Sequence, residues 1–351
     1  MSGKASKRKA ATDASPQAKR SNNKNNTDDD IESTSTLSYL GPPGSHSHAA
    51  AMSLPKTSPT STEFKLVQAD TIASVFENLV SGKTQYALVP WENSRSGSVT
   101  QALDAFKKFV GVARSGDDAS NGSSEGRIQI VNDLYHVVHQ SVLGVPNPDG
   151  DWKSTITNIY SHPEALSQVK MYLDECFLPS NTHSKTTTSP PSRVPVSSTS
   201  HAAQLAANSP HTSIAICSTV CAELYNLKVL QENVEDANDN TTRFLLVTRS
   251  SASNSNADTQ ASSSATAAPT LKIKTHLMMT LKQDENIATV CCKLGKGKDI
   301  MVTKIDSRPS GLENWNYTYY IEIISPSPLK LATEVKSMCS SLHVLGSYQM
   351  K

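Results

Sequence analysis

Short apolar runs alternate with helical stripes along residues 35–249, and a small polar turn joins each run to the helix after it. The run "YALVP" (86–90) is continuously apolar, as in a strand buried on both faces. In "TIASVFENLVSG" (71–82), four apolar residues recur at helical spacing and a glycine closes the pattern. Repetition of this unit predicts an α/β fold with largely parallel sheets.

Two polar stretches divide the chain. Residues 1–34 are poor in aromatic residues and rich in Ser, Asn, Lys and Asp, which predicts a solvated tail. Residues 250–270 are rich in Ser and Ala and lack aromatic residues, which predicts a flexible linker. The linker would separate a larger part, 35–249, from a smaller one, 271–351. Two further Ser-rich and Gly- or Pro-containing segments, 114–126 and 179–195, are predicted to be loops.

The overall charge gives little indication of a partner. Lys and Arg number 33 against 32 Asp and Glu, so the formal net charge of +1 favours neither nucleic acid nor an anionic membrane. The 6 cysteines form no C-x-x-C pair and no zinc-ligand pattern with histidine, so we expect reduced thiols and no metal. The absence of a roughly 20-residue apolar span and of a secretory signal predicts a cytoplasmic protein.

The basic tail leaves two other destinations open. Its segment "KRKAATDASPQAKR" (7–20) has the spacing of a bipartite nuclear-import signal. An organellar transit peptide is the remaining alternative, although the acidic "DDDIE" (28–32) argues against it. A nuclear, nucleic-acid-associated role would predict affinity that falls steeply with salt. We favour no nucleic-acid partner, because the basic residues outside the tail are not interleaved with aromatic ones.

Five turns place Ser, Thr, Asn or His where a helix is about to begin. Each alone is an ordinary helix cap. Together, at the carboxyl ends of strands, they predict a site for a small molecule with several negative charges. Carboxylates are favoured over phosphates because no glycine-rich phosphate-binding loop occurs. The turns are Gly44–Ala50, Asn93–Ser98, Ser161–Pro163, Ser197–Ser200 and Cys217–Thr219.

Six segments, taken in order, resemble those of the monofunctional prephenate dehydratases. Their order and spacing agree across nearly all of the chain after the tail, which makes the resemblance specific. The segments are "YLGPPGSHSHAAA" (39–51), "LVPWENSRSGSVTQALD" (88–104), "SHPEALSQ" (161–168), "AELYNLKVLQENVEDANDNTTRFLLV" (222–247), "KIDSRPS" (304–310) and "VLGSY" (344–348).

The resemblance implies a two-lobed catalytic domain of the periplasmic-binding type at 35–249, with the active site between its α/β lobes. It also implies a ferredoxin-like (βαββαβ) ACT domain at 271–351 that senses phenylalanine, and a homodimer or homotetramer. The implied reaction converts prephenate into phenylpyruvate, carbon dioxide and water in phenylalanine biosynthesis, without a metal or an organic cofactor.

The same resemblance implies roles for individual residues. Thr242 would place its hydroxyl at the departing group, and Arg243 would hold or orient a substrate carboxylate. Without the resemblance, Thr242 would be read as a β-forming residue at a strand end. The implied substrate-binding residues are Asn93, Ser94, Gly97, Ser161, His162, Ser198 and Thr199. The implied residues of the amino-acid effector site are Asp306, Ser307, Arg308 and Pro309.

Two further residues are expected to support the site. Glu92 would brace the cleft through hydrogen bonds. His139, in the apolar "VVHQSVLG", is expected to be a satisfied structural histidine on a strand.

Two departures from the family pattern bear on function. Glu164 stands where the family usually has glutamine, and it adds a negative charge near a dianionic substrate. The segment "ENIATV" (285–290) replaces the usual Gly-Ala-Leu, so we expect weak phenylalanine binding or none.

Other functions remain open at this point. The same motifs would serve an arogenate dehydratase, which produces phenylalanine directly. A cleft fold with an ACT module could also be a sensor without turnover, although the intact "TTRF" (241–244) disfavours this.

Overall fold

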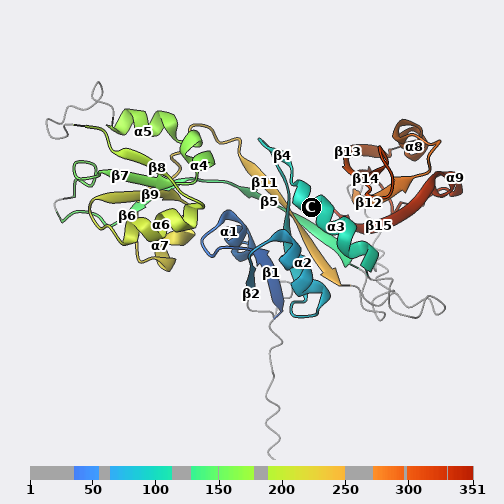
Figure 1. Cartoon of the computed structure of the whole chain (residues 1–351), viewed down its shortest axis with the longest axis horizontal. Coiled ribbons are helices and arrows are strands. Elements are labelled where there is room, and N and C mark those ends of the chain that lie inside the picture. Colours follow the sequence, from blue (N-terminus) through green and yellow to red (C-terminus); the bar gives the residue numbers. More distant parts are fainter. Residues whose placement is uncertain are drawn as a thin grey trace, which may run out of the picture. The chain divides into compact units, whose positions relative to one another are not determined.

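The computed structural model describes residues 35–54, 64–112, 128–148, 150–177, 189–249, 272–295, 299–329 and 331–350. These residues build three β-sheets with helices against them (Figure 1). The predicted tail, the predicted linker and the loop at 114–126 lie outside the described residues, as does most of 179–195. No helix among the described residues is long and apolar enough to span a bilayer.

The first sheet has mixed strand directions. Its order is β2 (Lys65–Ala69), β1 (Thr36–Leu40), β3 (Tyr86–Asn93), β11 (Thr241–Arg249) and β5 (Ile128–Val137), with β4 (Gly97–Ser98) paired to β3. Strand β1 runs parallel to both of its neighbours, whereas β11 runs antiparallel to β3 and β5. The expectation of largely parallel sheets was therefore wrong, because β11 enters this sheet after the chain has passed through the second one.

Helices cover both faces of the first sheet. Helices α2 (Ile72–Val80) and α3 (Thr100–Val112) pack on one face, where the rings of Phe76 and Phe106 meet edge to face at 4.9 Å. Helix α1 (His46–Met52) packs on the other face with Phe244. Helix α3 starts two residues later than Ser98, where the sequence places it, because Gly97 and Ser98 pair with β3 instead.

The second sheet is also mixed. Its order is β10 (Lys228–Gln231), β6 (Ser141–Gly144), β9 (Ser213–Cys217), β7 (Asn158–Ser161) and β8 (Ser192–Pro195). Its helices are α4 (Pro163–Gln168), α5 (Lys170–Phe177), α6 (Thr199–Ala207) and α7 (Val220–Leu224). Strand β8 corrects the loop prediction for the end of 179–195, since its backbone pairs in parallel with β7.

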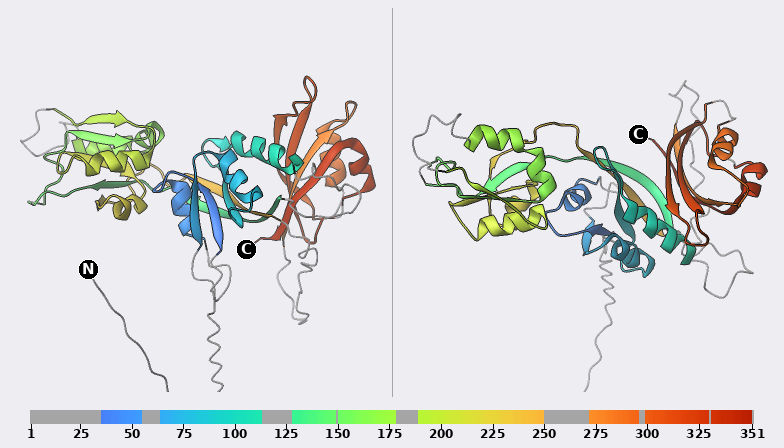
Figure 2. Two further views of the ribbon diagram at one scale, coloured as in Figure 1. Left: turned by 60° about the horizontal axis from the view of Figure 1, so that its bottom comes forward. Right: turned by 45° about the horizontal axis from the view of Figure 1, so that its top comes forward.

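The third sheet is antiparallel throughout, in the order β13 (Met301–Pro309), β14 (Tyr317–Ser325), β12 (Ile273–Leu281) and β15 (Cys339–Gln349). Helices α8 (Ile287–Leu294) and α9 (Thr333–Met338) cover one face (Figure 2). On the other face, Met278, Tyr320 and Leu345 join the core that lies beneath α2 and α3 of the first sheet. Because side chains alternate along β12 and β14, these two strands are buried on both faces of the sheet, whereas β13 has no buried residue.

Candidate active site

Strand β11 carries Thr242 and Arg243 on opposite faces, because successive side chains of a strand alternate. Thr242 lies at the start of the strand and is partly buried. Its Cα pairs with that of Asn93 on β3 and that of His136 on β5. The Nδ2 atom of Asn93 donates a hydrogen bond of 3.0 Å to Thr242 Oγ1. Two of the predicted site residues, Thr242 and Asn93, are therefore in direct contact.

The orientation of the Asn93 amide is fixed by its neighbours. Its Oδ1 atom accepts from the backbone N–H groups of Arg95 at 2.9 Å and Ser96 at 3.1 Å. Its Nδ2 atom therefore faces Thr242 and the Oδ1 atom of Asn240, the latter at 2.6 Å. Because Thr242 Oγ1 accepts from Asn93, the single proton of its hydroxyl remains available to another acceptor.

Asn240 and Gln168 extend this network, and sequence reasoning missed both. Asn240 Nδ2 donates to Gln168 Oε1 at 3.2 Å, and Gln140 Nε2 donates to the same oxygen at 3.4 Å. Asn240 is 5% exposed and Gln168 6% exposed. Since Gln168 ends α4, the network connects the first sheet to a helix of the second. The only sequence signal was that both amides fall within quoted motifs, Gln168 at the end of 161–168 and Asn240 inside 222–247.

Ser94 and Gly97 shape the loop after β3. Ser94 Oγ donates to the backbone carbonyl of Asp239 at 2.6 Å and accepts from the N–H of Thr241 at 2.8 Å. It thereby anchors the residue before Thr242. Gly97 has a φ of +80°, and an added Cβ atom would meet nothing within 4 Å. Its positive φ is the reason that glycine suits this position in the protein itself, because no protein atom would contact a side chain there.

The predicted residues of the second sheet gather at the carboxyl ends of β7 and β8. Ser161 is fully buried, and its Oγ atom donates to the carbonyl of Ile216 at 2.6 Å. His162 and Ser198 cap α4 and α6, and Thr199 is the first residue of α6. Ser161 and Ser198 lie close in the fold, because the carbonyl of Ser161 accepts from the backbone of Val196.

Glu164 and His139 can now be placed. Glu164 is exposed in the first turn of α4, and its N–H donates to His162 Nδ1 at 3.3 Å. His139 lies between strands β5 and β6, with an exposed side chain whose Nδ1 atom is 2.7 Å from Glu235 Oε1. His139 has a partner, but its expected position on a strand was wrong.

A tight contact joins the turn before α1 to the helices of the second sheet. The hydroxyl of Ser200 donates to the carbonyl of Pro43, and Cys221 Sγ lies 3.3 Å from the carbonyl of Gly44. Gly44 has a φ of +84°, and a Cβ atom there would lie 2.7 Å from Cys221 Sγ. Only glycine fits this position without displacement. The contact brings the Thr242 side of the first sheet next to α6.

Arg243 holds protein carboxylates on the opposite face of β11. The residue is 4% exposed. Its Nη1 atom lies 2.8 Å from Glu92 and 2.8 Å from Glu322, and its Nε atom lies 3.0 Å from Asp133. The cation expected to hold a substrate carboxylate is thus surrounded by three carboxylates of the protein, one of them from the third sheet.

Two lysines complete this buried ion cluster. Lys274 Nζ is 2.6 Å from Asp133, and Lys304 pairs with Glu92. Burial acts to lower the pKa of Arg243, but the carboxylates of Glu322 and Glu92 outweigh it and raise that pKa above its usual range. Burial acts to raise the pKa of Glu92, but Lys304 and Arg243 outweigh it and hold that pKa below its usual value. Arg243 and Glu92 are therefore both charged at neutral pH.

The predicted effector residues lie on β13, bonded to the first sheet and its helix α3. Asp306 Oδ1 accepts from Ser98 Oγ at 2.8 Å. Arg308 forms two hydrogen bonds with Asp104, at 2.9 and 2.7 Å. The carbonyl of Pro309 accepts from a lysine of α3, and Ser307 pairs with Tyr319 of β14. Asp306, Arg308 and Pro309 thus connect the third sheet to the first, whereas Ser307 pairs within the third sheet.

A comparison of the sequence with models of protein families shows which family the chain belongs to. The family model described as prephenate dehydratase matches residues 37–252. The chain belongs to the prephenate dehydratase family.

Curated relatives cover most of this family member. It is 25% identical to the prephenate dehydratase of Bacillus subtilis, over 89% of this chain and 98% of that protein. It is 28% identical to the bifunctional chorismate mutase/prephenate dehydratase of Pseudomonas aeruginosa, over 91% of this chain and 74% of that protein. It is also 28% identical to arogenate dehydratase 5, chloroplastic, of Arabidopsis thaliana, over 91% of this chain and 67% of that protein.

Solved structures share the fold. The prephenate dehydratase of Arthrobacter aurescens in complex with L-Phe aligns with a TM-score of 0.62 and 23% identity, over 89% of each chain. A protein described as GqqA, a quorum quenching acylase, aligns with a TM-score of 0.61 and 21% identity, over 90% of this chain and 98% of that one. At these identities the likeness concerns the fold alone.

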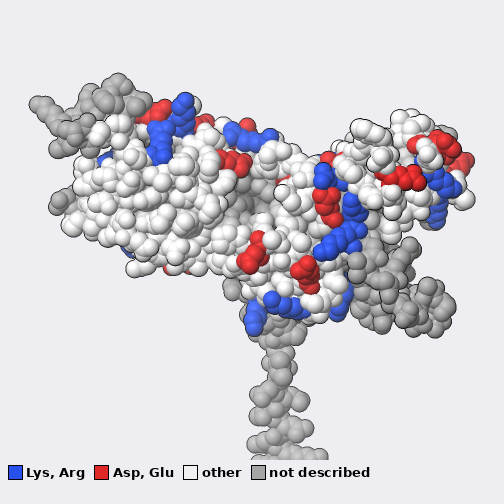
Figure 3. All heavy atoms as spheres, viewed as in Figure 1, with Lys and Arg blue, Asp and Glu red and all other residues white. Residues whose placement is uncertain are grey.

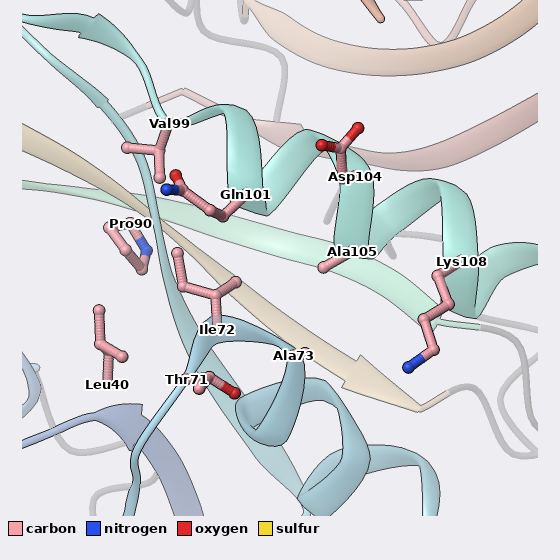
Figure 4. A pocket seen from close by; sticks show the side chains of 10 residues that line it. All are labelled: Leu40, Thr71, Ile72, Ala73, Pro90, Val99, Gln101, Asp104, Ala105 and Lys108. Atoms are coloured by element: carbon pink, nitrogen blue, oxygen red, sulfur yellow. The ribbon is translucent and has the colours of Figure 1, made fainter. Parts of the chain in front are cut away.

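Two pockets of this prephenate dehydratase family member lie away from Thr242. One, of about 600 Å³, lies between the carboxyl ends of β1 and β3 and helices α2 and α3 (Figure 4). Leu40, Ile72, Pro90 and Val99 converge there, and none of the predicted site residues lines it. The other, of about 390 Å³, is lined by Arg243 and its cluster. Thr242 is not among the residues that line either pocket, and its surroundings are defined by its hydrogen bond with Asn93.

Figure 3 shows basic and acidic side chains interspersed on the face it displays. Within the described ranges, no three His, Cys, Asp or Glu side chains come together as ligands for a metal ion.

Proposed function

We propose that this chain is a prephenate dehydratase that converts prephenate into phenylpyruvate, carbon dioxide and water. The observation that carries the proposal is the hydroxyl of Thr242, which accepts a hydrogen bond from Asn93 and keeps its own proton for another acceptor. Membership of the prephenate dehydratase family supports the choice of substrate.

The chemistry requires little beyond positioning and one donor. As the ring carboxylate leaves as carbon dioxide, its electron pair moves through the ring and expels the hydroxyl at the opposite carbon. That hydroxyl takes a proton, supplied in the end by solvent, and leaves as water. A hydrogen bond from Thr242 to the departing oxygen stabilises the charge that develops there. Aromatisation of the ring provides the thermodynamic drive.

The substrate is proposed to lie between the first and second sheets. Thr242, Asn93, Ser94 and Gly97 would approach it from the first sheet. From the second sheet the proposed substrate-binding residues are Ser161, His162, Ser198 and Thr199. The hydrogen bond from Asn240 to Gln168 and the contact of Gly44 with α7 support this assignment, because they hold the two groups near each other.

Arg243 is proposed to act on the reaction through the strand. Its Nη1 and Nε atoms are bound to Glu92, Asp133 and Glu322, and only Nη2 lacks a hydrogen-bond partner among the described residues. Because three protein carboxylates already surround the cation, we assign it the role of holding β11 in place beside Thr242. The two sheets are then the two lobes of a periplasmic-binding-type catalytic domain, residues 35–249.

Residues 271–351 are proposed to be an ACT domain. Their element order, β12-α8-β13-β14-α9-β15, and their strand order, β13-β14-β12-β15, support a ferredoxin-like module. Phenylalanine is the proposed effector, with Asp306, Ser307, Arg308 and Pro309 at its site, in a homodimer or homotetramer. The L-Phe complex of the Arthrobacter protein supports the choice of effector. The altered segment at 285–290 predicts weak phenylalanine binding or none, so titration of the chain with phenylalanine in a calorimeter decides between the two. Saturable heat would support the effector role, and its absence would contradict it.

The test of the main proposal is phenylpyruvate release from prephenate by the purified full chain. Thr242→Val keeps the branched shape without the hydroxyl, and we expect kcat to fall about 100-fold. Thr242→Ser keeps the hydroxyl and should retain most of the turnover. Equal turnover by the wild type and Thr242→Val would remove this hydroxyl from the chemistry, and no turnover by the wild type would overturn the proposed activity.

Arogenate is the second candidate substrate, supported by the Arabidopsis relative. It carries an amino group where prephenate carries a keto group. A comparison of kcat/KM for the two substrates separates the candidates. A larger value for arogenate would make the chain an arogenate dehydratase with the same Thr242 chemistry.

A further inference from the structure

One ring nitrogen beside the proposed site has no partner. The Nε2 atom of His46 is buried, and no hydrogen bond reaches it among the described residues. Burial, together with the nearby His136 and His139, lowers the pKa of His46 to about 4, so the ring is neutral at pH 7. An unpaired buried polar atom costs free energy, which a bound ligand can remove by supplying the partner.

His46 lies on the Thr242 side of the first sheet. Its ring centroid is 6.0 Å from that of His136. His136 and Thr242 are direct partners on the antiparallel strands β5 and β11, so their side chains project from the same face. Phe244, two residues further along β11, packs in one cluster with Ala50 of α1. Helix α1 therefore covers the face that presents the Thr242 hydroxyl.

His46 also adjoins the second sheet. It follows the turn whose Pro43 and Gly44 carbonyls accept from Ser200 of α6 and Cys221 of α7. Helix α6 begins with Thr199, one of the proposed substrate-binding residues. The unpaired nitrogen thus lies where the two groups of proposed substrate-binding residues converge.

The carboxylate whose charge acts on His46 already has hydrogen-bond partners. Glu235 is the acidic residue whose charge acts on His46. One of its oxygens lies 2.7 Å from His139 Nδ1, and the other accepts from the backbone N–H of Gln140 at 2.9 Å. The partner for His46 Nε2 must therefore come from outside the described residues.

We propose that His46 Nε2 donates a hydrogen bond to a carboxylate oxygen of the bound substrate. This inference rests on the proposed function, which supplies a substrate with two carboxylates. A hydrogen bond to a charged acceptor is about twice as strong as one between neutral groups. A neutral imidazole provides such a donor without adding another buried cation, and its location places the substrate carboxylate on the same face of the first sheet as the Thr242 hydroxyl.

Two substitutions at the same position test the role of the nitrogen. His46→Phe keeps a planar ring without a donor, whereas His46→Gln carries an amide N–H group close to the position of Nε2. We expect kcat/KM for prephenate to fall at least about tenfold in His46→Phe, mainly through a higher KM. His46→Gln should stay within about threefold of the wild type. Calorimetric titration of prephenate into Thr242→Val and His46→Phe/Thr242→Val should show the same loss of affinity without turnover.

The outcomes separate this inference from the proposed function. Wild-type turnover with an unchanged kcat/KM in His46→Phe would overturn the role of His46 alone. Equal losses in the two His46 variants would also overturn it, because they would trace the effect to ring packing. A wild type that neither turns over nor binds prephenate would overturn the proposed function and this inference together.

Discussion

Arg243 Nη1 lies 2.8 Å from a carboxylate oxygen of Glu322, so the strand that carries Thr242 is bonded to the third sheet. Glu322 also accepts from the indole N–H of Trp91 at 2.7 Å and is 3% exposed. A buried carboxylate with these partners must be satisfied in the folded state, since an unpaired buried charge is costly. The proposed ACT domain therefore contributes directly to the ion cluster behind the proposed active site.

Removal of the Glu322 charge should destabilise the protein and weaken catalysis. Glu322→Gln preserves size but leaves Arg243 with two carboxylates in place of three. We expect the free energy of unfolding to fall by about 2–4 kcal/mol, as measured by urea denaturation. We also expect a lower kcat with a smaller change in KM, because β11 loses a support without losing a substrate contact.

The matched control is Glu77→Gln. The salt bridge from Glu77 to Lys108 is 3.6 Å long, and both side chains are more than half exposed. An exposed pair of this kind contributes less than about 1 kcal/mol. Similar losses in Glu322→Gln and Glu77→Gln would contradict the structural role assigned to the buried cluster.

Substitution of Asn93 tests which of Asn93 and Thr242 is the donor in the hydrogen bond between them. In Asn93→Asp, the new carboxylate has no N–H group, so the Thr242 hydroxyl would donate to it and lose the proton proposed for the substrate. We expect kcat for phenylpyruvate release to fall about 100-fold. Asn147→Asp, at an amide that bonds Thr155 in an exposed loop, is the control and should leave kcat nearly unchanged. An active Asn93→Asp variant would show that Thr242 does not serve as the donor.

Local pattern was enough to predict much of the first sheet. The strand at Thr36–Leu40 and the helix at Ile72–Val80 follow from apolar spacing, and the Thr71 side chain caps that helix as its residue type suggests. The antiparallel course of β11 could not be predicted, because strand direction depends on where the chain returns after the second sheet.

The partners of Arg243 show why the site was harder to predict. Glu322, Asp133 and Glu92 are 79, 110 and 151 residues away along the chain. Spacing within a motif carries no signal for such contacts. The motif located the β11 strand, but only the tertiary fold shows that the cation faces away from Thr242.

Buried neutral histidines should make stability depend on pH. Burial, together with Arg243 and Lys274, lowers the pKa of His276 to about 3. In the unfolded chain the pKa of this histidine has its ordinary value near 6.5, so below that pH the unfolded chain binds a proton that the folded state does not bind. The free energy of unfolding should therefore decrease as pH falls from about 6.5 towards 4, by up to about 1.4 kcal/mol per pH unit for this residue.

A variant that lacks only His276 isolates the contribution of this residue. His276→Gln should give a shallower dependence of unfolding free energy on pH, as measured by urea denaturation at pH 6.5, 5.5 and 4.5. The difference in slope should approach one bound proton. Identical slopes in variant and wild type would mean that the His276 ring is protonated in the folded state.

Gly44 and Gly97 provide a last, paired prediction about the contact between the first two sheets. Both have φ near +80°, which disfavours any side chain. A Cβ atom at Gly44 would also lie 2.7 Å from Cys221 Sγ, whereas one at Gly97 would meet nothing within 4 Å. Gly97→Ala should therefore lower the free energy of unfolding by about 1 kcal/mol, the cost of the backbone conformation alone. Gly44→Ala should lower it by about 2–4 kcal/mol, because steric overlap adds to that cost. Urea denaturation of both variants checks this, and equal losses would mean that α7 does not contact this turn in solution.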